Sequence, residues 1–298
     1  MSKPTDHRAG FVNIIGNPNV GKSTLMNALV GEKLSIVTSK AQTTRHRIMG
    51  IVNGDNYQII YSDTPGILRP NYQLQEHMMD LVDIAIGDAD TILYVTDVVE
   101  TIDKNREYLE KLISIKVPVI LVINKIDLSN QQKLEQLVEQ WSALLPNAEI
   151  FPISALEKFN LDHLLIRIVS HLPPSPPWYP KELFTDRNLR FFASEIIREK
   201  IFLNYDKEIP YSTEVVIEHF IEEEKIYKIE AVIWVMRESQ KGIVIGAKGS
   251  KLKRVGTQAR KEMEAFFDRK VYLQLFVKVA SDWRTDPHKL KQFGYISP

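Results

Sequence analysis

The residues of this chain with the clearest chemical meaning form a glycine-rich loop near its start, Gly16-Asn17-Pro18-Asn19-Val20-Gly21-Lys22-Ser23. The loop fits G-x-x-x-x-G-K-[ST] and directly follows the apolar run 11–15. Its backbone N–H groups can face inward, Lys22 can reach the β- and γ-phosphates, and the Ser23 hydroxyl can ligate Mg²⁺. Thr24 opens a stretch of helical pattern, whose N-terminal dipole favours an anion. The loop predicts a nucleoside triphosphate site; the alternative is a plain glycine-rich turn.

The pattern around this loop indicates an α/β domain. Apolar β-branched runs alternate with amphipathic stretches up to about residue 170, which predicts a mostly parallel sheet covered by helices on both faces. Runs 46–53 and 57–62, joined by Gly54-Asp55-Asn56, predict an antiparallel hairpin within it. The expected strands are 11–15, 46–53, 57–62, 91–97, 117–123 and 149–153, and the expected helices are 22–30, 72–87, 103–115, 130–145 and 160–170.

Polar motifs stand where these strands end, which is where α/β domains bind ligands. The run 57–62 leads into Asp63-Thr64-Pro65-Gly66, in which Asp63 can act on Mg²⁺ through water and the Gly66 N–H can face a γ-phosphate. The run 117–123 ends in Asn124-Lys125-Ile126-Asp127. There the Asp127 carboxylate can accept hydrogen bonds from guanine, and a buried carboxylate left unpaired would reject adenine. A polar helix start with Asp127 near its N-cap is the alternative.

Two further assignments complete this site. The Asn124 amide is expected to fix the ribose side of the site, and the backbone N–H groups of Ser154-Ala155-Leu156 are expected to face guanine O6. Together with the glycine-rich loop and the motifs at Asp63 and Asp127, they predict a binding site for GTP and GDP.

In this order the four motifs resemble those of the translation-factor class of GTPases. The resemblance implies Mg²⁺ held by Ser23, by a switch threonine and, through water, by Asp63, with Lys22, Thr44 and Gly66 acting at the γ-phosphate. The segment 40–45 lies where that class keeps its first switch. The resemblance favours Thr44 over Thr43 as the ligand, whereas the residues alone leave the two open.

Two positions set expectations for catalysis. Ile67 follows the D-x-x-G motif where Ras-like enzymes place a glutamine that orients the attacking water. Because an aliphatic side chain cannot orient water by hydrogen bonding, slow intrinsic hydrolysis is expected. Asn19 resembles the asparagine with which relatives hold K⁺ near the phosphates, and this ion would supply positive charge in place of an arginine finger.

Length and composition set limits on the rest of the chain. The 298 residues suit two domains, and the absence of cysteine excludes disulfides and thiolate metal sites. The first ten residues contain no apolar segment of signal-peptide length, and the run 117–123 is far too short to span a membrane. A cytoplasmic protein is expected, with any membrane contact peripheral.

The segment 172–186 is expected to link two domains, 1–171 and 187–298. Five prolines between Leu172 and Pro180 predict an extended, fairly stiff spacer. A ligand for a proline-binding protein is the less favoured alternative.

The second domain concentrates positive charge. Residues 241–270 contain nine basic and three acidic side chains, which is typical of a surface that binds a polyanion. The pattern predicts a helix over 189–203, strands at 212–221, 226–236 and 271–280, and a basic helix over 250–267. With Gly246-Ala247-Lys248-Gly249 before that helix, the order resembles a prokaryotic-type KH domain, which implies single-stranded RNA. The expected RNA contacts are Ile245, Gly246, Ala247, Lys248, Gly249, Lys251, Lys253 and Arg254.

The arrangement of a GTPase domain, a proline-rich linker and one KH domain resembles the bacterial Era family over nearly the whole chain. The resemblance implies a monomeric GTP-dependent switch that binds small-subunit ribosomal RNA near its 3′ end and acts in assembly of the 30S subunit, with weak peripheral membrane contact at the inner face of the cell membrane. Two other classes remain open from the sequence: an ATP-dependent RNA-remodelling enzyme, and a non-catalytic RNA-binding module with a structural nucleotide.

Overall fold

A computed structural model describes residues 6–102 and 106–296, which divide into two compact units. The first unit comprises Met1–Pro70 and Met78–Asp186, and the second comprises Asn71–His77 and Arg187–Pro298. The division after Asp186 coincides with the predicted start of the second domain at residue 187. Among the described residues, no helix is both long enough and apolar enough to cross a membrane.

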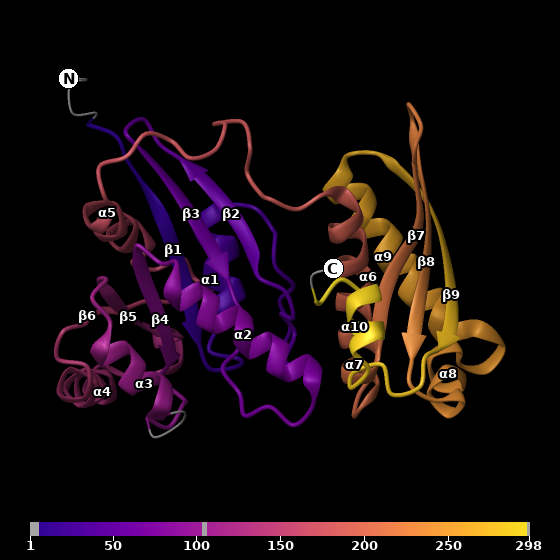
Figure 1. Cartoon of the computed structure of the whole chain (residues 1–298), viewed down its shortest axis with the longest axis horizontal. Coiled ribbons are helices and arrows are strands. Elements are labelled where there is room, and N and C mark those ends of the chain that lie inside the picture. The colour runs from indigo at the N-terminus through magenta and orange to yellow at the C-terminus, as the bar shows by residue number, and fades with distance from the viewer. Residues whose placement is uncertain (1–5, 103–105, 297–298) are drawn as a thin grey trace. The chain divides into compact units, whose positions relative to one another are not determined.

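The first unit is built on a six-stranded sheet of order β2-β3-β1-β4-β5-β6, surrounded by helices (Figure 1). All neighbouring strands are parallel except β2 and β3, which form the predicted antiparallel hairpin. Every residue of β4 and β5 is buried, as expected for parallel strands covered on both faces. The strands are β1 (Arg8–Gly16), β2 (Ile48–Asn53), β3 (Tyr57–Asp63), β4 (Thr91–Asp97), β5 (Val119–Asn124) and β6 (Glu149–Pro152).

The helices of this unit follow the predicted amphipathic stretches closely. The predicted helix 103–115 is present from Arg106 onward, and its first three positions lie outside the described residues. Asn130 caps α4, because its side chain accepts a hydrogen bond from the Lys133 backbone N–H. The helices are α1 (Lys22–Val30), α2 (Gln73–Gly87), α3 (Arg106–Ser114), α4 (Gln131–Leu144) and α5 (Leu161–His171), and α2 belongs to this unit from Met78 onward.

The proline-rich segment, for which the composition predicts an extended and fairly stiff spacer, lies along the first unit. The Ala9 N–H donates to the Pro173 carbonyl, and the Ile51 N–H donates to the Phe184 carbonyl. The segment therefore hydrogen-bonds to the start of β1 and to the outer edge of β2.

Gln58 of β3 holds the middle of this segment. Its Oε1 accepts hydrogen bonds from the N–H groups of Trp178 and Tyr179, at 2.6 and 2.9 Å, and its Nε2 donates to the Tyr179 carbonyl at 2.8 Å. Proline cannot donate a backbone hydrogen bond. The two non-proline residues at the end of the run supply the donors that the prolines lack.

The second unit contains the three-stranded sheet β7-β8-β9, with β7 antiparallel and β9 parallel to β8. Helices α6 (Leu189–Asn204) and α9 (Ser250–Phe267) pack against it around a core that includes Ile197, Ile233 and Val255. The strands are β7 (Glu214–Glu222), β8 (Ile226–Val235) and β9 (Lys270–Val279). This is the predicted order of helix, two strands, helix and strand.

Shorter helices complete the unit. They are α7 (Ile209–Ser212), α8 (Glu238–Ile245) and α10 (Pro287–Gln292). The Asp286 side chain caps α10 by accepting hydrogen bonds from the N–H groups of His288 and Lys289. Helix α8 ends directly before Gly246, so the G-x-x-G motif connects two helices and does not follow a strand.

Replacing Gln58 by alanine is expected to release the proline-rich segment from the first unit. Loss of three hydrogen bonds at about 1 kcal/mol each should raise the rate of amide hydrogen exchange at Trp178 and Tyr179 by more than about tenfold. The exposed Gln131, whose side chain donates to Glu135 of its own helix, is the matched control for substitution by alanine. Unchanged exchange at both amides in Gln58→Ala would show that the segment is held by other contacts.

Candidate functional site

The glycine-rich loop connects β1 to α1 and has a backbone that needs glycine at both ends. Gly16 and Gly21 have φ of 148° and 96°, and α1 begins at Lys22. A Cβ atom on Gly16 would lie 2.1 Å from the Val95 carbonyl oxygen, and one on Gly21 would lie 2.2 Å from the Asn124 side chain. The loop is therefore packed against the ends of β4 and β5 without space for side chains at these positions.

Lys22 points back into the loop, where its ammonium group is buried. Its Nζ donates to the carbonyl oxygens of Gly16 and Asn17, at 3.0 and 2.8 Å. Burial lowers the pKa of Lys22 to about 8, while the negative charges of Asp63 and Glu100 oppose this change. A phosphate group at the loop would favour the charged form of Lys22 in the same way.

Three side-chain oxygens predicted as Mg²⁺ ligands converge at the start of α1. The Ser23 hydroxyl donates to Asp63 Oδ2 at 2.7 Å and lies 3.0 Å from the Thr44 hydroxyl, which itself donates to Asp63 Oδ2 at 3.4 Å. Thr43 instead bonds to the Lys40 carbonyl and to the Thr38 hydroxyl. The geometry therefore favours Thr44 over Thr43 at this position.

This oxygen cluster fits a hard divalent cation. Burial raises the pKa of Asp63, an effect opposed by the charge of Lys22 and by hydrogen bonds from Ser23 and Thr44. Within the part of the chain that the structure describes, the second carboxylate oxygen of Asp63 is buried and has no hydrogen-bond partner. An oxygen-rich site with an unsatisfied carboxylate oxygen is the kind of site that Mg²⁺ occupies.

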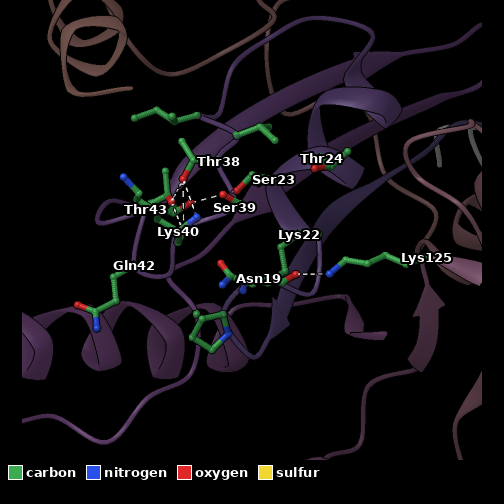
Figure 2. Close-up of a pocket in the computed structure, with 16 residues that line it drawn as sticks. Asn19, Lys22, Ser23, Thr24, Thr38, Ser39, Lys40, Gln42, Thr43 and Lys125 are labelled. Carbon is green, nitrogen blue, oxygen red and sulfur yellow. Dashed lines mark hydrogen bonds between the residues drawn. The ribbon is translucent and has the colours of Figure 1, made fainter. Parts of the chain in front are cut away.

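A cavity of about 350 Å³ opens beside the loop (Figure 2). It is lined by the loop, by residues between 36 and 44, and by Gly66 and Lys125. Figure 2 shows Asn19, Lys22 and Ser23 on it together with Thr38 and Thr43. Residues 127 and 154–156 are not part of its lining. The cavity therefore corresponds to the phosphate half of the predicted site.

The D-x-x-G motif lies against the glycine-rich loop. The Ile67 N–H donates to the Gly16 carbonyl at 3.0 Å, and a Cβ on Gly66 would lie 2.8 Å from Pro18. The Ile67 side chain is 1% exposed, so it packs in the core and offers nothing to a water molecule. This position agrees with the expectation that the residue after D-x-x-G does not orient the attacking water.

The guanine side of the site differs from the prediction in two details. The Asn124 amide does not lie free for ribose, because its Nδ2 donates to the Val20 carbonyl and its Oδ1 accepts from the Ala155 N–H, both at 2.9 Å. Asp127 lies in a short 3₁₀ helix, is exposed and accepts from the Ser154 hydroxyl at 2.6 Å. Asn124 thus holds two loops together, and a bound base would have to bury the Asp127 carboxylate. The alternative of Asp127 as a helix cap does not apply, since Asn130 caps α4.

Two acidic residues at and just after the end of β4 were missed in the sequence. Asp97 accepts from Lys125 Nζ, which also donates to the Asn19 carbonyl, both at 2.6 Å. Glu100 accepts from the Asn17 amide and from the Thr96 hydroxyl. Because both acids stand close to a strand end, the rule applied to β3 and β5 would also have found them.

In the second unit the G-x-x-G motif leads into α9 beside a cleft of about 360 Å³. Gly249 and Lys253 of the predicted RNA residues line this cleft. A cation and apolar side chains beside a glycine loop suit the phosphates and bases of a single strand. The lining residues that the sequence did not single out are Leu252, Gly256, Thr257, Arg260, Leu273 and Leu275.

The remaining predicted RNA residues occupy other positions. Ile245, Gly246, Ala247 and Lys248 form the end of α8 and the turn before α9. Arg254 lines a different hollow between α6 and α9, and Lys251 Nζ lies 5.9 Å from the centre of the Tyr205 ring. Basic side chains of α9 therefore point in two directions, and one group faces the cleft beside β9.

The sheet order, the four nucleotide motifs and the second unit define a P-loop GTPase joined to a KH domain. A family described as a 50S ribosome-binding GTPase matches residues 11–125, and the KH domain family matches residues 208–284. GTPase Era of Staphylococcus haemolyticus is 45% identical over 98% of both chains, and that of Staphylococcus epidermidis is 44% identical over the same share. The chain belongs to the Era family of GTPases.

Solved structures agree over the same length. A crystal structure of Era in complex with MgGDPNP and nucleotides 1506-1542 of 16S ribosomal RNA has a TM-score of 0.93 at 40% identity, and covers 97% of this chain and 99% of its own. A single-residue variant of Aquifex aeolicus Era bound to GDP·AlF4⁻ matches with the same values. The predicted family, fold class and GTPase activity are thereby confirmed, against an ATP-dependent enzyme and against a non-catalytic module.

The affinity for GDP is expected to fall as pH rises through about 8. Phosphates bind the charged form of Lys22, and the free protein loses this form above a pKa of about 8. Below that pH the lysine is protonated in both states, so affinity should level off; above it, binding should take up a proton. Calorimetry from roughly pH 7 to 9, in buffers of different ionisation enthalpy, measures both effects. Lys22→Arg keeps its charge and should give a flat profile, whereas a flat profile in the unmodified protein would contradict the prediction.

Proposed function

We propose that this GTPase is a molecular switch that binds small-subunit ribosomal RNA near its 3′ end and acts in assembly of the 30S subunit. The observation on which the proposal rests is the presence of both sites in one chain that matches, over 97% of its length, an Era solved with MgGDPNP and 16S ribosomal RNA. Such a role implies a cytoplasmic protein, and a peripheral membrane contact remains a prediction from the sequence.

In this proposal Mg²⁺ is bound by Ser23 and Thr44, with Asp63 acting through water. When bound, the ion supplies positive charge to the β- and γ-phosphate oxygens. The residues of the chain have separate roles around it: Lys22 contacts the phosphates, and the Gly66 N–H donates to the γ-phosphate. Since Thr44 would reach the metal only with the γ-phosphate present, its position distinguishes GTP from GDP.

Guanine recognition is assigned to Asp127, with Asn124 holding the loops on either side of it. The Ala155 N–H already donates to Asn124, so it would not be the donor to the base. The base would instead contact the Asp127 carboxylate and the part of the loop that contains Leu156. The remaining loop residues, from Gly16 to Thr24, would surround the phosphates with backbone N–H groups.

Hydrolysis is expected to be slow without an added activator, because the buried Ile67 cannot position water. Asn19 is suited to hold K⁺ instead. Its φ of 67° turns the loop so that the side chain lines the cavity, while its carbonyl accepts from Lys125. An amide oxygen is a ligand type that hard cations accept.

Phosphate release from GTP is expected to be about tenfold faster in K⁺ than in Na⁺ at equal ionic strength. This acceleration is smaller than the one that an arginine finger provides. Asn19→Gly removes the side-chain oxygen but tolerates the positive φ, so it should abolish the difference without straining the loop. Single-turnover assays with both proteins measure it. Equal rates of the unmodified protein in the two salts would refute the potassium site.

RNA binding is assigned to the cleft beside α9, with Gly246, Ala247, Lys248 and Gly249 approaching the nucleic-acid backbone. The Arg260 guanidinium lies at this cleft and pairs with Glu264 one turn along, at 3.0 Å. GTP and Mg²⁺ would order the segment 33–47 and the segment after Gly66, and we propose that this ordering changes the affinity for RNA.

The test is the affinity for a single-stranded RNA with the sequence of the 3′ end of small-subunit ribosomal RNA, measured with GDP and with a non-hydrolysable GTP analogue. Unequal affinities are expected, and equal affinities would refute the coupling between nucleotide and RNA.

Arg260→Ala should weaken RNA binding about tenfold with either nucleotide, since a lost phosphate or base contact costs roughly 1–3 kcal/mol. Lys261→Ala, which removes a cation from the other side of α9, is the matched control. Equal effects of the two variants would show that the cleft is not the binding site.

A further inference from the structure

A partly buried polar cluster connects the end of the segment 33–47 to the end of helix α2. At its centre the Arg47 guanidinium donates to both carboxylate oxygens of Asp88, at 2.5 and 3.0 Å. Its Nε donates to the Ser62 hydroxyl at 2.5 Å, and its Nη2 donates to Asn13 Oδ1 at 3.2 Å. The Arg47 side chain is 8% exposed and the Asp88 side chain is 44% exposed, so the guanidinium is buried while its carboxylate partner lies at the surface.

Asn13 connects the same cluster to β1. Its Nδ2 donates to Asp88 Oδ1 at 2.7 Å and to the Ala85 carbonyl at 2.5 Å. Asn13 is fully buried and stands three residues before Gly16. We call the four side chains Asn13, Arg47, Ser62 and Asp88 the switch clamp.

The switch clamp has a defined place in the chain. Arg47 ends the segment 33–47, directly before β2, and Asp88 directly follows α2, the helix that comes after the D-x-x-G motif. A two-pronged contact between guanidinium and carboxylate fixes orientation as well as distance, which a single hydrogen bond does not. The end of one switch segment is therefore fixed to the end of the helix that follows the other.

This anchor restricts Thr44. Thr44 stands three positions before Arg47, and three extended residues span roughly 10 Å. With Arg47 held, the Thr44 hydroxyl can move only within that distance, while the rest of the segment from 33 to 43 stays free to change. Ordering Thr44 at the metal then costs less conformational entropy than ordering it on an unanchored loop.

We propose that Arg47 and Asp88 form a positioning pair that acts through Thr44 to favour GTP over GDP. The pair touches neither nucleotide nor metal, so it is not catalytic. The proposal rests on the role proposed for Thr44 above. Because GDP offers Thr44 no γ-phosphate-dependent site, the pair affects the GTP-bound state and leaves GDP affinity nearly unchanged.

The test is the ratio of affinities for a non-hydrolysable GTP analogue and for GDP, both with Mg²⁺, in Asp88→Asn, Thr44→Ala and the double variant. Asp88→Asn preserves shape but replaces one acceptor oxygen with a donor facing Arg47, and should lower the ratio about tenfold, within the usual range of coupling. In the Thr44→Ala background the same change should have no further effect on the ratio. Asp83→Asn, which removes the partner of the exposed Lys111 from the same helix, is the control and should leave the ratio unchanged.

The outcomes separate the two proposals. If Thr44→Ala lowers the ratio but Asp88→Asn does not, or lowers affinity for both nucleotides equally, the positioning pair is refuted and the role of Thr44 stands. If Thr44→Ala leaves the ratio unchanged, the role of Thr44 and the positioning pair are both refuted. If Asp88→Asn has its full effect on the ratio even in the Thr44→Ala variant, the pair does not act through Thr44. Should Asp88→Asn fail to fold, Arg47→Lys, which keeps the charge but loses the two-pronged contact, gives the same comparison.

Discussion

The burial of the Lys22 ammonium group is the interaction on which the nucleotide site depends. A charge removed from water must be compensated by nearby polar groups. Here the carbonyl oxygens of Gly16 and Asn17 accept its hydrogen bonds, and it is stabilised by the charges of Asp63, at the end of β3, and of Glu100, shortly after β4. These are the two strands on either side of β1. The loop and the oxygens predicted to bind Mg²⁺ are thus arranged around the Lys22 ammonium group. A bound phosphate would supply the rest of the negative charge that balances it.

Side-chain contacts between strand ends hold this arrangement before nucleotide binds. Asn124 connects the glycine-rich loop to the loop after β6, and Lys125 connects the first loop to Asp97 at the end of β4. Each contact joins segments that lie far apart in sequence but meet at one edge of a parallel sheet. A site held in this way loses little conformational entropy when nucleotide binds. More of the interaction energy with phosphate and base therefore contributes to the affinity.

What the sequence could predict follows from how local each signal is. The nucleotide motifs are contiguous and follow strands, so their position was predictable. The side-chain direction of Asn124 was not, since its partners Val20 and Ala155 lie in two loops far apart in the sequence. Proline content predicted a stiff linker but not its attachment, because the partner is Gln58, hidden inside a strand. The switch clamp escaped for the same reason: its four residues stand at four separate places in the chain, and no spacing connects them.

The basic helix of the KH domain shows where helical periodicity, applied further, would have refined the prediction. Residues three, four or seven apart share a side of a helix, so Lys253, Gly256 and Arg260 form one side of α9, and Arg254, Gln258 and Lys261 form another. The structure divides them in this way between two hollows. A Cβ on Gly256 would lie 3.2 Å from the Leu275 side chain, so a larger residue there would require Leu275 to shift. Gly249, by contrast, has open space around it and a φ of 77°, which makes its requirement conformational. The two glycines serve one cleft by different means: Gly256 allows α9 to approach β9, and Gly249 turns the backbone where a nucleic-acid strand can come close.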